Sequence, residues 1–179
     1  MDEIILNGKR FRKYIDEKQI SDAVRKMAES INNDLSGRED VVFIGILNGA
    51  FLFAADLFRN INLNAKISFL KLASYQGTSS SGLIRDLIGW NEDVQDKTVV
   101  VVEDIVDTGN TLDLIVGGLQ LRKAREIRVA TLLFKPDACR KSIAPDYVGF
   151  KIPNDFVVGY GLDYDGYGRN IPAIYTIVN

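Results

Sequence analysis

The chain of 179 residues contains no histidine. Histidine is the usual general base near neutral pH and the commonest protein ligand of transition metals. Any acid or base in this protein must therefore be a carboxylate, a lysine or a tyrosine. Any bound metal should be a hard ion that prefers oxygen ligands, such as Mg²⁺.

Cysteine is nearly absent as well, since Cys139 is the only one. It cannot form an internal disulfide, and without a histidine to activate it we expect an inert thiol rather than a nucleophile. No stretch approaches the roughly 20 apolar residues of a membrane-spanning helix, and no apolar run at the amino end resembles a signal peptide. We therefore expect a cytoplasmic protein with no membrane partner.

Neither sign of charge dominates the composition. The 22 Lys and Arg residues nearly balance the 24 Asp and Glu residues, which gives a net charge of −2. Nucleic-acid binding usually needs a basic footprint, so we expect no nucleic-acid partner. A hydrophobic content of 46% over this length is typical of a globular protein, and we expect a single domain spanning residues 1–179.

The most informative segment runs from Thr98 to Leu112. Four valines, 99–102, follow Thr98 without polar alternation, which is typical of a parallel strand covered on both faces. Two acids come next, Glu103 and Asp104. The following residues favour a turn or a helix cap: Asp107, Thr108, Gly109, Asn110 and Thr111. Apolar residues at 112, 115, 116 and 119 then predict a helix.

This pattern predicts a phosphate site at the start of the helix. The backbone N–H groups of a first helical turn have no partner, and the helix dipole favours an anion there. Thr108 and Thr111 add hydroxyl donors, and Gly109 lets the backbone approach closely. Glu103 and Asp104 would repel a phosphate unless a ribose with Mg²⁺ lay between them. The simpler alternative is an ordinary strand-turn-helix in which Asp and Thr serve only as caps.

Strand and helix patterns alternate along the rest of the chain. Helices are predicted from about Asp16 to Leu35 and from Asn48-Gly49 to about Phe58. Strands are predicted at 4–14 with a turn at Asn7-Gly8, and at 41–46, 65–72, 127–134, 147–150, 156–160 and 173–178, with a mobile loop at 74–82. Gly117 and Gly118 lie inside the third helix, where we expect close approach to a neighbour. This order predicts an α/β fold with a parallel sheet, and the termini should build a small cover over its carboxyl edge.

The segment 99–111 resembles the phosphoribosyl-pyrophosphate (PRPP) binding motif of type I phosphoribosyltransferases. That motif is an apolar run, two acids, two apolar residues and then Asp-Thr-Gly-x-Thr. Further segments are similar to the hypoxanthine-guanine branch of the family, so the resemblance extends from about residue 41 to 170. They are Ile46–Gly49, Ser74-Tyr75, Leu132–Lys135, Asn154–Tyr160 and Gly161–Tyr164 with Arg169.

The resemblance implies a type I phosphoribosyltransferase fold, with a central, mostly parallel sheet flanked by helices and a hood formed from the termini. It also implies roles for the PRPP end of the site. PRPP would be bound by Glu103, Asp104, Asp107, Thr108, Gly109, Asn110 and Thr111. Pyrophosphate would be held by Leu47, Asn48, Gly49 and Arg169. Mg²⁺ would be the cofactor, with Asp163, Glu103 and Asp104 as ligands.

For the base, the resemblance implies purine contacts by Lys135, Phe156, Val157 and Asp163. Lys135 would donate to the 6-oxo group, Phe156 would stack on the ring, and backbone groups around Val157 would read its edge. Asp107 would take the proton at purine N7, because no histidine can. Ser74 and Tyr75 would begin a flexible loop that closes over the reaction centre.

The implied reaction is purine salvage. The phosphoribosyl group of PRPP passes to N9 of hypoxanthine or guanine, and the nucleotide and pyrophosphate are released. Alternatives are a transferase for xanthine or orotate, a PRPP-binding regulator, and a nucleotide-binding module without catalysis. Many relatives carry Lys or Arg in place of Asn48, which puts the strength of pyrophosphate binding in doubt, and some carry Lys in place of Asn110. Relatives form dimers or tetramers, so we expect a homo-oligomer.

Overall fold

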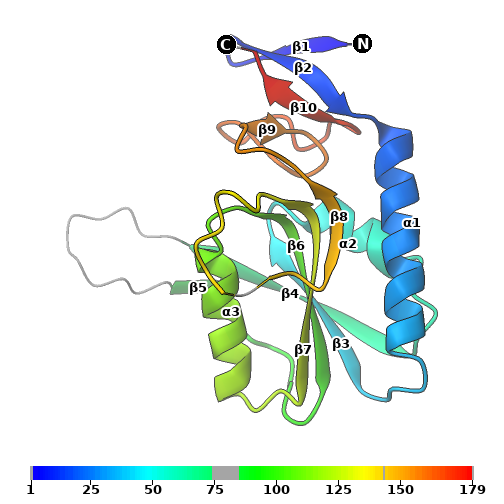
Figure 1. Ribbon diagram of the computed structural model, residues 1–179. Helices are drawn as coiled ribbons and strands as arrows, with labels where there is room; N and C mark the ends of the chain where they lie inside the picture. The colour runs from blue at the N-terminus through cyan, green and yellow to red at the C-terminus, as the bar shows by residue number, and fades with distance from the viewer. Residues whose placement is uncertain (1, 74–84, 143, 179) are drawn as a thin grey trace.

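The computed structural model describes residues 2–73, 85–142 and 144–178 (Figure 1). Three helices are present in these ranges: α1 (Glu17–Asp34), α2 (Phe51–Phe58) and α3 (Asn110–Leu121). The strands are β1 (Glu3–Leu6), β2 (Lys9–Ile15), β3 (Val41–Leu47), β4 (Ala65–Ala73), β5 (Arg85–Ile88), β6 (Thr98–Val106), β7 (Glu126–Phe134), β8 (Tyr147–Lys151), β9 (Val157–Val158) and β10 (Ile174–Ile177). None of the helices in these ranges is long and apolar enough to cross a membrane.

The larger sheet has six strands in the order β5-β4-β3-β6-β7-β8. All neighbours are parallel except β5, which pairs antiparallel with β4 at one edge. The central strand β6 lies between β3 and β7, and its four consecutive valines, 99–102, are at most 1% exposed. The mostly parallel α/β sheet expected from the sequence is therefore confirmed.

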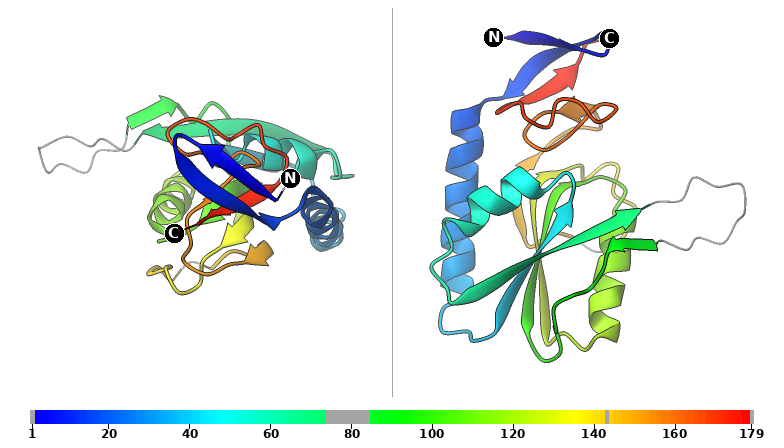
Figure 2. Two further views of the ribbon diagram at one scale, coloured as in Figure 1. Left: turned by 90° about the horizontal axis from the view of Figure 1, so that it is seen from above. Right: turned by 180° about the vertical axis from the view of Figure 1, so that it is seen from behind.

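Helices cover both faces of this sheet. Helices α1 and α2 pack on one face, where Val100 and Val102 of β6 join their hydrophobic core. Helix α3 packs on the other face, against Val99 and Val101. Figure 2 shows α1 and α2 together on the side opposite α3. The strand lacks alternation because both of its faces are buried.

A second sheet forms the hood over the carboxyl ends of the parallel strands. Its order is β1-β2-β10-β9, so both ends of the chain contribute to it (Figure 1). All pairs in it are antiparallel. A small core of its own holds it together, in which Phe11 and Val158 are completely buried. This is the cover that the sequence predicts.

Several predicted elements are confirmed closely. Helix α1 begins after the N-cap Asp16 and ends at the C-cap Leu35, and Asp16 and Gln19 form a reciprocal capping box. The apolar positions of its predicted core face are all buried, namely 20, 24, 27, 31 and 35. The predicted loop at 74–82 falls outside the described residues.

Other predictions need correction. Strand β5 is not anticipated in the sequence, because it is a four-residue edge strand with no periodic signal of its own. The strand expected at 156–160 shrinks to Val157–Val158, since Gly159 and Tyr160 have positive φ and turn the chain. Close approach at Gly118 is confirmed, because an added Cβ would lie 3.0 Å from the Trp90 ring. At Gly117 the expectation is wrong, because a Cβ there would meet no atom within 4 Å.

Candidate functional site

The start of α3 forms a small cradle at the carboxyl end of β6. Gly109 is the N-cap residue and adopts the left-handed conformation, with φ 82°, and no side chain caps the helix. The first-turn amides therefore keep their donor capacity, apart from a 3.4 Å bond from Asn110 N–H to Thr108 Oγ1. A cavity of about 240 Å³ opens at this turn and is lined by Glu103 and residues 105–112. Its size and donors suit a phosphate group.

Two buried acids lie beneath the cradle. Glu103 is 8% and Asp104 9% exposed. Burial, together with the negative charge of Asp104, raises the pKa of Glu103 well above its ordinary value. Burial raises the pKa of Asp104 to about 6, although Arg169 and backbone N–H groups counteract this increase. Within the described residues, Glu103 Oε2 is a buried side-chain oxygen without a hydrogen-bond partner. Such a group is costly for folding and is expected where a ligand binds.

Two glycines bring together Asp104 of β6, the loop after β3 and the loop after β9. A Cβ on Gly49, which follows β3, would overlap Oδ2 of Asp104. A Cβ on Gly161 would in turn overlap the carbonyl oxygen of Gly49. The loop after β9 is therefore stacked on the loop after β3, which is stacked on Asp104, and only glycine permits this spacing. The peptide bond between Leu47 and Asn48, at the start of this contact, is cis.

Arg169 is fixed beside this stack by two contacts. One guanidinium nitrogen lies 2.6 Å from Oδ1 of Asp163, and the other donates to the Gly161 carbonyl at 2.7 Å. The second oxygen of Asp163 accepts a hydrogen bond from Gly166 N–H at 2.7 Å. Both side chains are about 30% exposed, at 28% and 30% respectively. The loop thus presents one cation and one carboxylate, both partly open to solvent.

Lys135 and Asp107 form an ion pair at the carboxyl ends of β7 and β6. The ammonium of Lys135 lies 2.8 Å from Asp107 Oδ2. Lys135 is only 7% exposed, so it does not emerge into solvent as a free cation. The Asp107 side chain remains 43% exposed. A donor and an acceptor are therefore held next to each other beside the cradle.

Phe156 and Val157 lie in the hood rather than in the cradle. Phe156 is 46% exposed, and its ring packs edge-on against Tyr164, with 5.8 Å between ring centroids. Val157 is buried and pairs with Thr176 of β10, while β9 is the outermost strand of its sheet. The Phe156 carbonyl accepts from Ile177 N–H. Because backbone groups alternate along a strand, those of Val157 point to the unpaired edge.

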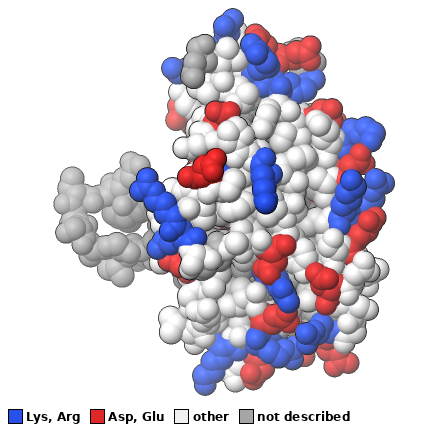
Figure 3. All heavy atoms as spheres, viewed as in Figure 1, with Lys and Arg blue, Asp and Glu red and all other residues white. Residues whose placement is uncertain are grey.

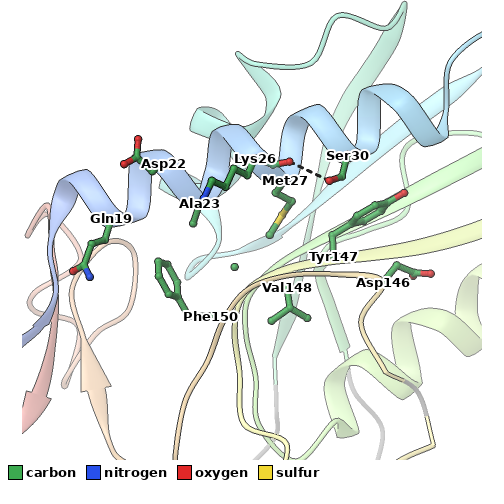
Figure 4. Close-up of a pocket in the computed structure, with 11 residues that line it drawn as sticks. Gln19, Asp22, Ala23, Lys26, Met27, Ser30, Asp146, Tyr147, Val148 and Phe150 are labelled. Carbon is green, nitrogen blue, oxygen red and sulfur yellow. Dashed lines mark hydrogen bonds between the residues drawn. The ribbon is translucent and has the colours of Figure 1, made fainter.

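A larger cavity lies elsewhere. It measures about 510 Å³ and lies between α1 and β8, with Met27, Tyr147 and Phe150 among its walls (Figure 4). None of the site residues expected from the sequence lines it. Basic and acidic side chains are interspersed over the face in view in Figure 3. We take the cradle as the candidate site, because the described structure leaves the buried Glu103 Oε2 beside it without a hydrogen-bond partner.

The sequence missed the contribution of Gly161. Four glycines in this stretch have positive φ, at 159, 161, 166 and 168. Their spacing signals irregular backbone, but only the folded chain shows that Gly161 touches Gly49. Ser74 and Tyr75 lie outside the described residues. Among the described residues, no group of three or more His, Cys, Asp or Glu side chains could hold a metal by itself.

The chain is similar to known proteins of one family. The phosphoribosyl transferase domain family matches residues 13–165 of the chain. The hypoxanthine-guanine phosphoribosyltransferase of Mycobacterium tuberculosis is 44% identical over 165 residues, which cover 89% of this chain and 82% of that protein. The Aquifex aeolicus protein of the same name is 35% identical over 173 residues, covering 96% and 97%.

Solved structures show the same similarity. A hypoxanthine-guanine phosphoribosyltransferase from Bacillus anthracis superposes with a TM-score of 0.86 at 37% identity, covering 93% of this chain and 98% of that one. A hypoxanthine phosphoribosyltransferase from Staphylococcus aureus gives a TM-score of 0.87 at 36% identity, covering 93% and 91%.

Proposed function

We propose that this chain, which belongs to the phosphoribosyltransferase family, transfers the 5-phosphoribosyl group of PRPP to N9 of hypoxanthine or guanine. Pyrophosphate leaves, and a purine ribonucleoside monophosphate forms. The observation that carries the proposal is the cradle at the start of α3, with the buried Glu103 and Asp104 beneath it.

The cradle would bind the 5′-phosphate of PRPP. The first-turn amides of α3 and the hydroxyls of Thr108 and Thr111 are donors for its oxygens. Glu103 and Asp104 would accept hydrogen bonds from the ribose hydroxyls, which would satisfy the orphaned Glu103 Oε2. Their negative charge would also stabilise the cationic sugar that forms as the anomeric C–O bond stretches.

The purine would lie between the hood and the Lys135–Asp107 pair. On a 6-oxopurine protonated at N7, the O6 acceptor and the N7–H donor are adjacent. The ammonium of Lys135 would donate to O6, and Asp107 would accept the N7 proton as N9 attacks the sugar. The exposed ring of Phe156 offers a stacking face, and the free edge of Val157 offers backbone donors and acceptors for the rest of the base.

The leaving pyrophosphate would be held by the backbone of Leu47, Asn48 and Gly49 and by Arg169. The carboxylates of Glu103, Asp104 and Asp163 are hard oxygen donors that suit Mg²⁺, and the unpartnered Glu103 Oε2 fits such a role. Magnesium usually takes only one or two protein carboxylates together with substrate oxygens and water. Bound Mg²⁺ would supply positive charge against the departing pyrophosphate.

The proposal includes a cytoplasmic location and a homodimer or homotetramer, both of which the resemblance to hypoxanthine-guanine phosphoribosyltransferases implies. Light scattering of the purified protein gives its mass directly. A monomer would remove this part of the proposal and leave the reaction in place.

A turnover assay with four bases tests the function. Hypoxanthine, guanine, xanthine and adenine are offered in parallel with PRPP and Mg²⁺, and nucleotide formation is followed by absorbance. We expect turnover of hypoxanthine and guanine and little of adenine, because an amino group in place of O6 would face the ammonium of Lys135. A clear preference for xanthine would assign the chain to another base. PRPP binding without any turnover would favour a regulator.

Replacing the general base tests the assigned mechanism. We expect Asp107→Asn to lower kcat by about 100-fold, within the range that general base catalysis supplies. Asp137→Asn is the control, because Asp137 is an exposed carboxylate in the segment that follows β7. Thermal melting of each variant checks that the loss is not caused by unfolding once Lys135 is unpaired. Wild-type kcat in folded Asp107→Asn would show that the role is assigned wrongly.

A further inference from the structure

The phosphate cradle is supported from outside by the segment that follows β7. Figure 1 shows this segment passing beside the start of α3. The Arg140 N–H donates to the Thr108 carbonyl at 3.2 Å. A Cβ placed on Gly109 would lie 3.1 Å from Cys139 Sγ and 3.1 Å from Lys141 Cβ. Residues 139–141 therefore pack directly against the left-handed turn that shapes the cradle.

Two ion pairs join the same two segments on either side of this contact. Lys135 pairs with Asp107, and Lys141 Nζ lies 2.8 Å from Asp113 Oδ2. In each pair the partners are 28 residues apart in the chain. In the proposed function, Lys135 and Asp107 bind the base. The pair of Lys141 and Asp113 has no such role.

Asp113 is the acidic residue of the first turn of α3. A carboxylate at this position favours the helix by itself, because it faces the positive end of the helix dipole. It is unfavourable once a dianionic phosphate occupies the same end of the helix, since like charges repel. Lys141 neutralises Asp113 and holds it in an ion pair that is about 40% exposed, with side-chain exposures of 38% and 44%.

We propose that Lys141 is a positioning residue for the 5′-phosphate of PRPP. It acts through Asp113, whose charge it cancels. It also acts through Gly109, because the Cβ and Cγ of Lys141 lie 3.1 and 3.2 Å from the position that a Cβ on Gly109 would take. This inference rests on the proposed function and adds a specific support to its phosphate site. The proposed function gives Lys141 no role at the base or at the acids beneath the sugar, so its removal should affect phosphate binding alone.

The test measures steady-state kinetics and the binding of ribose 5-phosphate by calorimetry. We expect Lys141→Ala to raise KM for PRPP about five- to tenfold, with kcat and KM for hypoxanthine within about twofold of the wild type. The dissociation constant for ribose 5-phosphate should rise by the same factor. Lys141→Arg should restore binding, because it keeps the charge opposite Asp113. The increase should shrink in high salt, since the pair is exposed.

A double variant that also removes the charge of Asp113 distinguishes action through Asp113 from a direct contact between Lys141 and the phosphate. We expect Lys141→Ala with Asp113→Asn to bind ribose 5-phosphate nearly as well as the wild type. Lys18→Ala is the matched control, since Lys18 forms an exposed ion pair with Asp22 on α1 at 2.6 Å. Unchanged phosphate binding in Lys141→Ala, or no recovery in the double variant, would overturn the inference. Failure of the wild type to transfer phosphoribosyl groups would instead overturn the proposed function.

Discussion

At the scale of single residues, the site is built from groups that a folded protein would normally avoid. Glu103 and Asp104 are adjacent carboxylates, both buried, and one oxygen of Glu103 lacks a hydrogen-bond partner. Burying charge without compensation opposes folding. The sequence revealed these acids because they follow the run of four valines in β6. It could not reveal the ion pairs of Lys135 and Lys141, which join residues 28 positions apart.

The raised pKa of Glu103 makes a prediction about stability. In the folded protein this carboxyl holds its proton to higher pH than in the unfolded chain. The folded state therefore binds more protons between the two pKa values, and stability falls as pH rises through that window. Glu103→Gln should raise the free energy of unfolding at pH 7 by about 1 kcal/mol or more, and the gain should disappear near pH 4. It should also weaken PRPP binding.

Urea denaturation at several pH values checks this. Glu126→Gln is the control, because Glu126 is paired with Arg128 at 2.7 Å. Neutralising it removes this ion pair, so the Glu126→Gln variant should be less stable than the wild type at pH 7. A Glu103→Gln variant that is less stable than the wild type at pH 7 would contradict the account.

At the scale of elements, local patterns predict most strands and helices but not how they meet. The uninterrupted valines of β6 and the periodic face of α1 are local signals, and both elements are confirmed. Strand β5 and the early end of β9 depend on neighbours and backbone turns that no local pattern encodes. The contact of the loop after β9 with the loop after β3 is likewise visible only in the folded chain.

That contact leads to a prediction with a control in the same loop. Gly161 and Gly166 both have positive φ, 100° and 83°, but only a Cβ at 161 would overlap the Gly49 carbonyl. Gly166→Ala should cost about 1 kcal/mol of stability from backbone strain alone. Gly161→Ala should cost more and should also raise KM for PRPP, because it separates the loop carrying Arg169 from the loop at 47–49. Equal effects of the two changes on stability and KM would contradict this.

At the scale of the whole molecule, the fold brings together segments from both ends of the chain. The hood contains β1, β2, β9 and β10, and it stands over the carboxyl ends of β3, β6 and β7 (Figures 1 and 2). The proposed site therefore lies between two sheets, where the phosphate groups would bind at the parallel sheet and the base would bind under the hood. The sequence predicts this arrangement because alternating strands and helices leave only the termini to form a cover.

The most direct test locates the phosphate by NMR. Ribose 5-phosphate is titrated into the isotope-labelled protein, and the amide signals are followed residue by residue. We predict the largest shifts at Thr108–Leu112, with no comparable change at Lys26 or Gly149, which line the larger cavity between α1 and β8. Shifts centred on that larger cavity, or none at the start of α3, would contradict the account.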